Sequence, residues 1–294
     1  MNILVTGSAG FIGKELLKEL RKEKHNTIEF DLSKGQNLLN PKDLDALKGA
    51  EIVIHLAALL DESKTLEELN TVNVKGTELL LEKCVEFKIK KFIYLSTVGV
   101  MGNITKQADE NTSLNPQTKY EKTKAEAEKK VNEFQELIPI TIIRSALVLG
   151  PNKYWKQITE LIKKGFPLIG EGKNNFQVIY YKDLVSAILF CLKKAETENE
   201  TFIVAEEKPK KLVNLYCLIQ KELGIEKKIK VLPVFLARIY AFFKGSSILR
   251  NEYIQRLVRE RNYSTEKINK LGWKAKYSTE DAVKETIKEL NAKN

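Results

Sequence analysis

The stretch that decides the fold is "ILVTGSAGFIGKELLKEL", residues 3–20. An apolar run typical of a strand precedes three glycines, Gly7, Gly10 and Gly13, and an amphipathic helical pattern follows them. Gly7 permits a tight turn, Gly10 leaves room for a phosphate against the backbone, and Gly13 lets the helix pack closely on the strand. Because the free N–H groups at the start of that helix attract anions, the pattern predicts a dinucleotide-binding turn.

Strand and helix patterns alternate through the first half of the chain. We predict strands over 2–6, 26–31, 50–58, 91–96 and 139–148, and helices over 14–23, 64–88 and 119–137. Helices of this length between strands require right-handed crossovers and a parallel sheet. The expected fold class is therefore α/β, a Rossmann-type doubly wound parallel sheet with a smaller, mainly helical C-terminal lobe.

The pattern changes near Gly150, where we place a domain boundary. Residues 1–150 are expected to form the dinucleotide-binding domain, with 172–206 returning to it. Residues 151–171 and 207–294 are expected to form a substrate-binding lobe. Within these later parts we predict helices over 154–164 and 182–194 and strands over 176–181 and 201–206.

Composition indicates an ordinary globular protein. Of the 294 residues, 43% are hydrophobic and 30% are charged, so a packed core is expected. The net charge is +10, but Lys alternates with Glu along the helical patterns, which is typical of solvated faces. The excess of positive over negative residues is clearest between Lys244 and Lys276, and positive charge there would suit an anionic substrate. No motif for nucleic-acid recognition accompanies the charge, so we expect no nucleic-acid partner.

Metal, disulfide and membrane segments are not indicated. The three cysteines are far apart without metal-ligand spacing, and with two histidines the chain is poorly equipped for a His-based metal site or a Ser-His-Asp triad. The apolar run from Val231 to Phe243 contains Pro233 and Arg238 and is too short to span a bilayer. Met1 leads directly into a strand pattern, so no signal peptide fits. We therefore expect reduced thiols, no metal, no membrane span and a cytoplasmic location.

A tyrosine and a lysine in "YEKTK", residues 120–124, indicate proton-transfer chemistry. Four residues of separation place Tyr120 and Lys124 on one face of a helix, one turn apart. A free tyrosine titrates near about pH 10, too high for a base at neutral pH. A nearby ammonium, or the positive nicotinamide of an oxidised cofactor, stabilises the phenolate, so we expect Lys124 to lower the pKa of Tyr120. On a lysine-rich helix the same spacing also arises by chance.

The second predicted strand ends in an acid that bears on the choice of cofactor. Asp31 can accept hydrogen bonds from an adenosine ribose diol and would repel a 2′-phosphate. This favours NAD over NADP, although the nearby Lys34 would soften the preference.

Several segments together resemble one family. "TGSAGFIG", residues 6–13, resembles the TGxxGxxG loop of the extended short-chain dehydrogenase/reductases, the NAD-dependent epimerases and dehydratases with their hydroxysteroid dehydrogenase-like and dihydroflavonol reductase-like relatives. Further family landmarks follow in the same order: "IVIHLAA" (52–58), "NVKGT" (73–77), "FIYLSTVGVMG" (92–102), "YEKTK" (120–124), "IIRSALVLGP" (142–151), "YYKDLVSAI" (180–188) and "LGWKAKYSTEDAVKETI" (271–287). They cover nearly the whole chain, so it is identified as a member of this family and expected to be an oxidoreductase.

The resemblance implies catalytic roles. Tyr120 would exchange a proton with a substrate hydroxyl or carbonyl while hydride moves to or from the nicotinamide, and Lys124 would also hold the nicotinamide ribose. Thr97 falls at the family's Ser/Thr position and would hydrogen-bond the reacting oxygen; Ser96, one residue away, is the alternative. Asn73 would fix backbone near the active site, directly or through a water.

The resemblance also implies a set of cofactor contacts. Asn37 stands where the family often has an Asp that contacts the adenine. With Asp31, Asn73, Tyr120 and Lys124, the expected NAD-binding residues are Gly7, Ala9, Gly10, Phe11, Ile12, Gly13, Asn37, Leu38, Leu56, Ala57 and Ala58.

The sequence leaves the small-molecule substrate open. Many nucleotide-sugar members carry an Arg in the segment that reads here "GEGKNNFQVIYYKD" (170–183), which has none; Lys173, Arg259 or Arg261 could supply the charge instead. The segment "VLPVFLARIYAFFKG" (231–245) resembles the tail of hydroxysteroid dehydrogenase-like members, which lies near a lipophilic substrate, although ordinary core packing is the interpretation we favour.

Three functional hypotheses follow. The first is a nucleotide-sugar epimerase, dehydratase or reductase, which an Arg and Lys cluster at the cofactor cleft would favour. The second is a dehydrogenase or reductase for a lipophilic alcohol or ketone, which an apolar cleft roofed by 231–243 would favour. The third is a non-catalytic NAD(P)-binding sensor or assembly subunit, against which Thr97, Tyr120 and Lys124 argue. The resemblance also allows a homodimer through the helices over 64–88 and 119–137.

Overall fold

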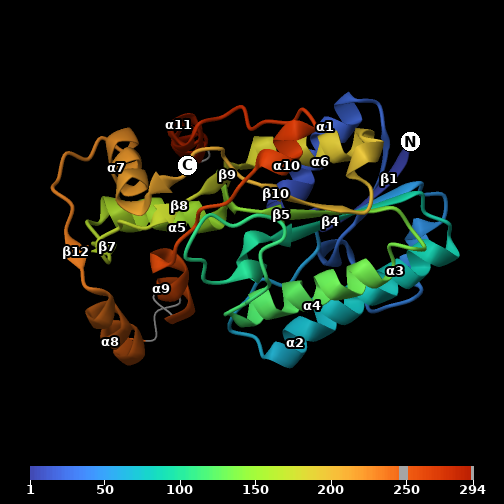
Figure 1. Ribbon diagram of the computed structural model, residues 1–294, viewed down its shortest axis with the longest axis horizontal. Helices are drawn as coiled ribbons and strands as arrows, with labels where there is room; N and C mark the ends of the chain where they lie inside the picture. The colour runs from blue at the N-terminus through green and yellow to red at the C-terminus, as the bar shows by residue number, and fades with distance from the viewer. Residues whose placement is uncertain (245–250, 293–294) are drawn as a thin grey trace.

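A six-stranded sheet forms the centre of the molecule, with helices on both faces and a smaller lobe at one end (Figure 1). The structure is a computed structural model, and it describes residues 1–244 and 251–292. The strands run in the order β10-β5-β4-β3-β1-β2, and every neighbouring pair is parallel. Their bounds are β1 (Asn2–Thr6), β2 (Asn26–Phe30), β3 (Ile52–His55), β4 (Lys91–Thr97), β5 (Ile140–Ser145) and β10 (Glu200–Val204). The predicted doubly wound parallel sheet is confirmed.

The sheet order predicts where a ligand binds. From β1 the chain passes first to β2 on one side and then to β3 on the other. The connections therefore diverge at β1, and in sheets of this kind a ligand is expected at the carboxyl ends of the two strands that flank the divergence, here β1 and β3. The glycine turn follows β1 directly and therefore lies at this edge of the sheet, beside the end of β3.

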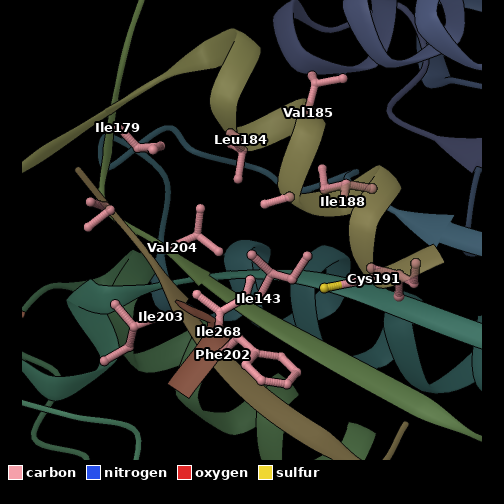
Figure 2. Packing of buried hydrophobic residues seen from close by; sticks show 14 of the residues in the cluster. Ile143, Ile179, Leu184, Val185, Ile188, Cys191, Phe202, Ile203, Val204 and Ile268 are labelled. Carbon is pink, nitrogen blue, oxygen red and sulfur yellow. The ribbon is translucent and has the colours of Figure 1, made fainter. Parts of the chain in front are cut away.

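Helices bury apolar stripes on both faces of the sheet. On one face lie α1 (Phe11–Lys22) and α6 (Tyr181–Lys193), and Figure 2 shows Leu184, Ile188 and Cys191 of α6 packed toward Ile143 and Val204. The opposite face is covered by α3 (Gly76–Glu86) and α4 (Lys119–Glu133), preceded by α2 (Leu66–Asn70) and a π-helical turn η3 (Thr71–Lys75). Short 3₁₀ turns complete this half: η1 (Leu32–Lys34), η2 (Asp43–Leu47), η4 (Val98–Met101) and η5 (Ala195–Thr197).

The C-terminal lobe is built from short strand pairs and helices. Its strands are β6 (Leu147–Leu149), β7 (Leu168–Ile169), β8 (Asn175–Phe176), β9 (Val178–Tyr180), β11 (Lys210–Lys211) and β12 (Val231–Leu232), paired as β6–β9, β7–β12 and β8–β11. Its helices are α5 (Lys153–Lys163), α7 (Leu212–Glu222), α8 (Val234–Lys244), α9 (Asn251–Val258) and α11 (Thr279–Asn291), while α10 (Glu266–Lys270) packs on β10. The core of this lobe includes Trp155, Leu215 and Ile287.

The expectation of ordinary core packing for residues 231–245 is wrong for the part of the segment whose side chains are described. Ala237 of α8 is fully buried against Ile169 and Ile254, but Phe235 and Ile239 are 63% and 51% exposed. The reason is geometric: α8 lies at the end of the lobe and packs on α9, which leaves Phe235, Leu236 and Ile239 exposed. In the described ranges, no helix combines the length and hydropathy needed to span a membrane.

Candidate active site

The glycine turn after β1 is shaped by close backbone contacts. Gly7 has φ +69°, and a Cβ atom there would lie 2.8 Å from the Ala57 nitrogen. A Cβ on Gly13 would lie 2.2 Å from the Gly7 carbonyl oxygen, so only glycine lets α1 approach the strand this closely. Gly10 caps α1 without a side-chain hydrogen bond, and the first turn carries no acid. These features fit a diphosphate at the helix N-terminus.

Asp31, at the end of β2, reaches back to this turn. Its Oδ2 accepts a hydrogen bond from the Ala9 N–H at 3.0 Å, and its Oδ1 accepts from the Ser33 N–H at 2.9 Å. Burial disfavours its charged form, but the hydrogen bonds from Ser33 and Ala9 outweigh this and lower the pKa of Asp31. Lys34 forms an ion pair with Glu29. A charged carboxylate thus stands where a ribose diol would need an acceptor.

The other expected cofactor residues lie in three places. The N–H groups of Leu56 and Ala57 each donate to Thr6 Oγ1 at 3.2 Å, which fixes the end of β3, just before Ala58, beside the turn. Phe11 packs against Tyr181, with ring centroids 4.9 Å apart, and Ile12 packs on the core under α6. In the loop after β2, Asn37 is exposed, with its Oδ1 accepting from the Leu39 N–H, and Leu38 is buried.

Asn73 ties two parts of the site together. Its Oδ1 accepts from the Leu59 N–H at 2.7 Å, and its Nδ2 donates to the Leu59 carbonyl and to Thr123 Oγ1, both at 3.0 Å. The side chain therefore joins the loop after β3 to α4 by direct contacts. It projects from the π-helical turn η3, a feature that often marks functional sites.

Lys124 belongs to α4 (Lys119–Glu133), and its side chain reaches β4 near the carboxyl end of that strand. Helix α4 begins with a capping box between Thr118 and Glu121, which places residue 120 in its first turn. The Nζ atom of Lys124 donates to the Leu95 carbonyl at 2.8 Å and lies 4.0 Å from the centroid of the Tyr94 ring. Burial lowers the pKa of Lys124 to about 7, against the opposing effect of Glu128.

The sequence-based expectation for the pKa of Tyr120 is wrong in sign. Burial raises this pKa to about 12, and the carboxylates of Glu121 and Glu62 act in the same direction. The cation that opposes the rise is Arg256 rather than Lys124, whose ammonium is directed at Leu95 and the Tyr94 ring. Burial of a side chain depends on the tertiary fold, so the spacing of the motif alone does not reveal it.

The two candidate hydroxyls at the end of β4 differ in their surroundings. Thr97 is half-buried, and its Oγ1 accepts from the Gly99 N–H at 3.1 Å, capping the turn η4. The Ser96 hydroxyl is buried and has no hydrogen-bond partner within the part of the chain that the structure describes. Successive side chains of a strand point to opposite faces, so Ser96 shares a face with Tyr94 and Thr97 does not.

A network of buried charged side chains lies beside Tyr120. Its residues form no sequence motif, so the sequence analysis did not predict it. The Arg256 guanidinium lies 5.9 Å from the centroid of the Tyr120 ring and donates to Glu62 Oε1 at 2.5 Å. Arg259 donates to both oxygens of Glu121 rather than standing free for a substrate. The excess of positive charge late in the sequence did point to these arginines. It could not identify their carboxylate partners, because these lie 138 to 194 residues away in the sequence.

Arg261 is placed differently from Arg256 and Arg259. It is buried, its Nη2 donates to the Arg256 carbonyl at 2.9 Å, and its guanidinium lies 4.4 Å from the centroid of the Phe176 ring. Burial lowers its pKa to about 10. Within the described ranges no carboxylate is within ion-pair distance of it. Lys173, the other suggested cation, is exposed and pairs with Glu171.

A cavity of about 320 Å³ opens beside Phe176 in the C-terminal lobe. Its walls come from α5, β7, α7 and α9 and include Trp155, Phe166, Phe176, Tyr216 and Leu257. The Trp155 Nε1–H donates to the Val148 carbonyl and the Tyr216 hydroxyl to the Phe166 carbonyl, so both polar tips are satisfied inside the protein. Among the residues described, none from 231–243 lines this cavity, and α9 covers it instead.

Comparison with known proteins identifies the family. Residues 3–205 match the NAD dependent epimerase/dehydratase family. The chain is 30% identical to an uncharacterized UDP-glucose epimerase of Bacillus subtilis, over 75% of this chain and 81% of that protein. It is 25% identical to UDP-glucose 4-epimerase of Vibrio cholerae, over 97% and 94% of the two chains. The chain therefore belongs to the NAD-dependent epimerase/dehydratase family.

Solved structures agree with this assignment. The UDP-glucose 4-epimerase of Thermotoga maritima, crystallised with UDP-glucose, superposes with a TM-score of 0.84 at 26% identity, covering 100% of this chain and 99% of that one. The dTDP-glucose 4,6-dehydratase of Bacillus anthracis in complex with NAD has the same fold, with a TM-score of 0.79 at 24% identity, over 100% and 97% of the chains. The protein is thus an NAD-dependent enzyme of the extended short-chain type, and its glycine turn and Asp31 fit that cofactor.

Proposed function

We propose that the protein transfers hydride between NAD and a carbinol or ketone carbon of a nucleotide sugar, as an epimerase or dehydratase does. Residues 1–150 and most of 172–206 would hold the cofactor, and the lobe of 151–171 and 207–294, which β8 and β9 of the segment 172–206 join, would hold the substrate. The observation that carries the proposal is Arg261, a buried guanidinium with no carboxylate partner among the described residues. A buried cation is costly unless an anion pairs with it, and a diphosphate would do so bidentately.

The surroundings of Arg261 match the parts of a nucleotide sugar. On one side, Phe176 and the aromatic cavity would accept a planar base. On the other side, Arg261 donates to the carbonyl of Arg256, and the guanidinium of Arg256 lies beside Tyr120. The sugar would lie next to Tyr120. Relatives named for UDP- and dTDP-sugars support the same assignment.

The residues of this chain divide the work at the reacting carbon. When bound, NAD accepts or returns the hydride. The N–H groups at the start of α1 would bind its diphosphate, and Asp31 would accept hydrogen bonds from its adenosine ribose. Tyr120 would take the proton from the sugar hydroxyl and return it, while Thr97 would orient the reacting oxygen. Lys124 would hold the nicotinamide ribose from its position at the end of β4.

A second candidate is a lipophilic alcohol or ketone. The apolar lining of the cavity, whose Trp155 and Tyr216 donors are already satisfied, favours it. Arg261 distinguishes the two candidates, because an uncharged lipophilic substrate offers it no partner.

The test is to remove the charge of Arg261 and measure substrate affinity. Arg261→Gln should raise the KM for UDP-glucose or dTDP-glucose about 10- to 100-fold, the effect of losing a charge-assisted hydrogen bond, with NAD affinity unchanged. Arg238→Gln, an exposed arginine on α8, is the matched control and should leave KM unchanged. If neither nucleotide sugar binds the NAD-loaded protein in calorimetry, while a lipophilic ketone does, the second candidate replaces the first.

Assembly and location belong to the same proposal. Helices α3 and α4 lie side by side on the outer face of the sheet, as a homodimer through a four-helix bundle would require (Figure 1). Analytical ultracentrifugation should then give twice the chain mass. The free thiols of Cys84 and Cys191 suit a reducing cytoplasm.

A further inference from the structure

Three charged side chains, Glu62, Glu121 and Arg256, lie near Tyr120, and Arg259 joins them through its ion pair with Glu121. Glu62 belongs to the loop after β3, Glu121 to α4, and Arg256 and Arg259 to α9 and the segment that follows it. The carboxylate side chains of Glu62 and Glu121 are only 1% and 3% exposed. Burying these carboxylates is costly unless cations pair with them, so the network fixes the position of the arginine segment relative to α4.

Arg256 is held at several points of this network. Its Nη2 donates to Glu62 Oε1 at 2.5 Å and to Thr118 Oγ1 at 2.7 Å, and its Nε lies 3.4 Å from Glu121 Oε1. Thr118 is the N-cap residue of α4, so the arginine contacts the helix at the turn that carries Tyr120. A planar guanidinium can reach these partners together, whereas a lysine ammonium is a single point charge on a flexible stem.

The charges that face the Tyr120 phenol come from each neighbouring element. Glu121 lies on α4, Glu62 on the loop after β3, Tyr94 on β4 and Arg256 on α9. The two carboxylates favour the neutral phenol. Lys124 is directed at the Leu95 carbonyl and the Tyr94 ring, so among the described residues Arg256 is the cation that lies at the Tyr120 ring.

We propose that Arg256, anchored by Glu62 and Thr118, is a positioning residue that holds the Tyr120 phenol in place and favours its ionised form. This inference rests on the proposed function in one respect, namely that Tyr120 is the base. The inference adds Arg256, which lies outside the Tyr–Lys motif, to the residues that act on Tyr120. Through Arg256, helix α9 of the C-terminal lobe would influence the ionisation of the Tyr120 phenol.

The first test is a titration of Tyr120 that needs no substrate. Tyrosine NMR with carbon labelling of the NAD-loaded protein, assigned by comparison with Tyr120→Phe, follows the ionisation of this one phenol. Arg256→Gln should move its midpoint to higher pH by about one unit or more, because an opposite charge at this distance favours the ionised form. Arg238→Gln, which removes an exposed charge from α8, should leave the midpoint unchanged.

The second test separates positioning from a general loss of structure. With a nucleotide sugar as substrate, Arg256→Gln should lower kcat about tenfold at neutral pH with little change in KM, and Arg256→Lys, which keeps the positive charge, should recover part of the lost activity. A purely structural role would lower kcat equally in both variants, and that result overturns the inference. If Arg256→Gln does not fold, Arg256→Lys should show a smaller shift in the same direction.

The two proposals fail in different ways. An unchanged Tyr120 midpoint in both Arg256 variants overturns the positioning role, whatever the substrate is. Absence of nucleotide-sugar binding in the wild-type protein overturns the proposed substrate, yet the titration result still stands by itself.

Discussion

The glycine turn and the arginine segment over 256–261 both serve the candidate site, but they are built in different ways. The turn is shaped by backbone contacts. A Cβ atom on Gly7 would collide with Ala57, and one on Gly13 with the Gly7 carbonyl, so both positions require glycine. The arginine segment is held by side-chain ion pairs, of Arg256 with Glu62 and of Arg259 with Glu121.

This difference teaches what each region contributes. The turn depends on glycine at fixed spacing and on close backbone contacts with the end of β3, and we expect it to bind a cofactor common to a large family. The arginine segment depends on contacts between distant elements, and it joins the C-terminal lobe to α4. We therefore expect substitutions in the turn to change cofactor affinity, and those near Tyr120 to change turnover.

The largest expected effect follows removal of the Tyr120 hydroxyl. Tyr120→Phe should reduce kcat about a thousandfold, within the range for loss of a general acid–base, because the proton of the sugar hydroxyl then has no acceptor. NAD affinity, measured by calorimetry, should change little. The comparison between the two regions would break down if this variant lost NAD binding but kept its turnover per bound cofactor.

A large effect on stability is expected from Lys124. Below pH 7 both the folded and unfolded states hold its proton, and the cost of burying the charge is fully present. Between its folded pKa of about 7 and its ordinary value of 10.5, the unfolded chain keeps a proton that the folded protein has released. The free energy of unfolding should therefore rise with pH in this window, by about 1 kcal/mol per pH unit from this group.

Lys124→Met serves as the comparison for that measurement. Its urea-unfolding free energy, followed over the same pH window, should lack this rise while all other groups titrate as before. Parallel curves for the two proteins would show that Lys124 keeps its proton when buried.

A smaller effect is expected from an added methyl group in the turn. Gly13→Ala forces a Cβ atom against the Gly7 carbonyl, so the turn must shift, at a cost of about 1–3 kcal/mol, and NAD should bind roughly 10- to 100-fold more weakly. Lys14→Ala, at an exposed position on the same helix, is the control. Equal NAD affinity in both variants, measured by calorimetry, would mean that the close approach of α1 does not shape the cofactor site.

The smallest expected effect concerns the choice of dinucleotide. Asp31→Ala removes the acceptor beside the turn and the charge that repels a 2′-phosphate, so the ratio of NAD to NADP affinity should fall about tenfold. Asp45→Ala, an exposed acid on η2, should leave the ratio unchanged. A ratio that stays constant in calorimetry after loss of Asp31 would remove its ribose role.

Much of the fold could be predicted because its signals are local. The glycine spacing and the alternation of strands and helices are sufficient for the parallel sheet, and β1, β2 and β4 lie within a residue of their predicted bounds. The small strands β7, β8 and β11 have two residues each, which is too short for a periodic signal. The exposure of α8 also escaped prediction, since an apolar helix pattern does not specify which neighbours cover it.

The candidate site shows the same division. Tyr120 and Lys124 could be located by their spacing, and Asn73 by the resemblance, because these belong to contiguous motifs. Glu62 and Arg256 could not, since their contact joins residues 194 positions apart. The direction of the Tyr120 pKa shift was also out of reach, because it depends on burial and on carboxylates that only the tertiary structure brings near.

The most direct test of the central claim is to mix the NAD-loaded protein rapidly with UDP-glucose or dTDP-glucose and follow the absorbance of reduced nicotinamide. If Tyr120 and Lys124 face the cofactor held by the glycine turn, reduced nicotinamide should form in the wild-type protein and be absent in Tyr120→Phe. Equal formation in both proteins, or turnover of the sugar with no reduced nicotinamide in the wild type, would contradict the account.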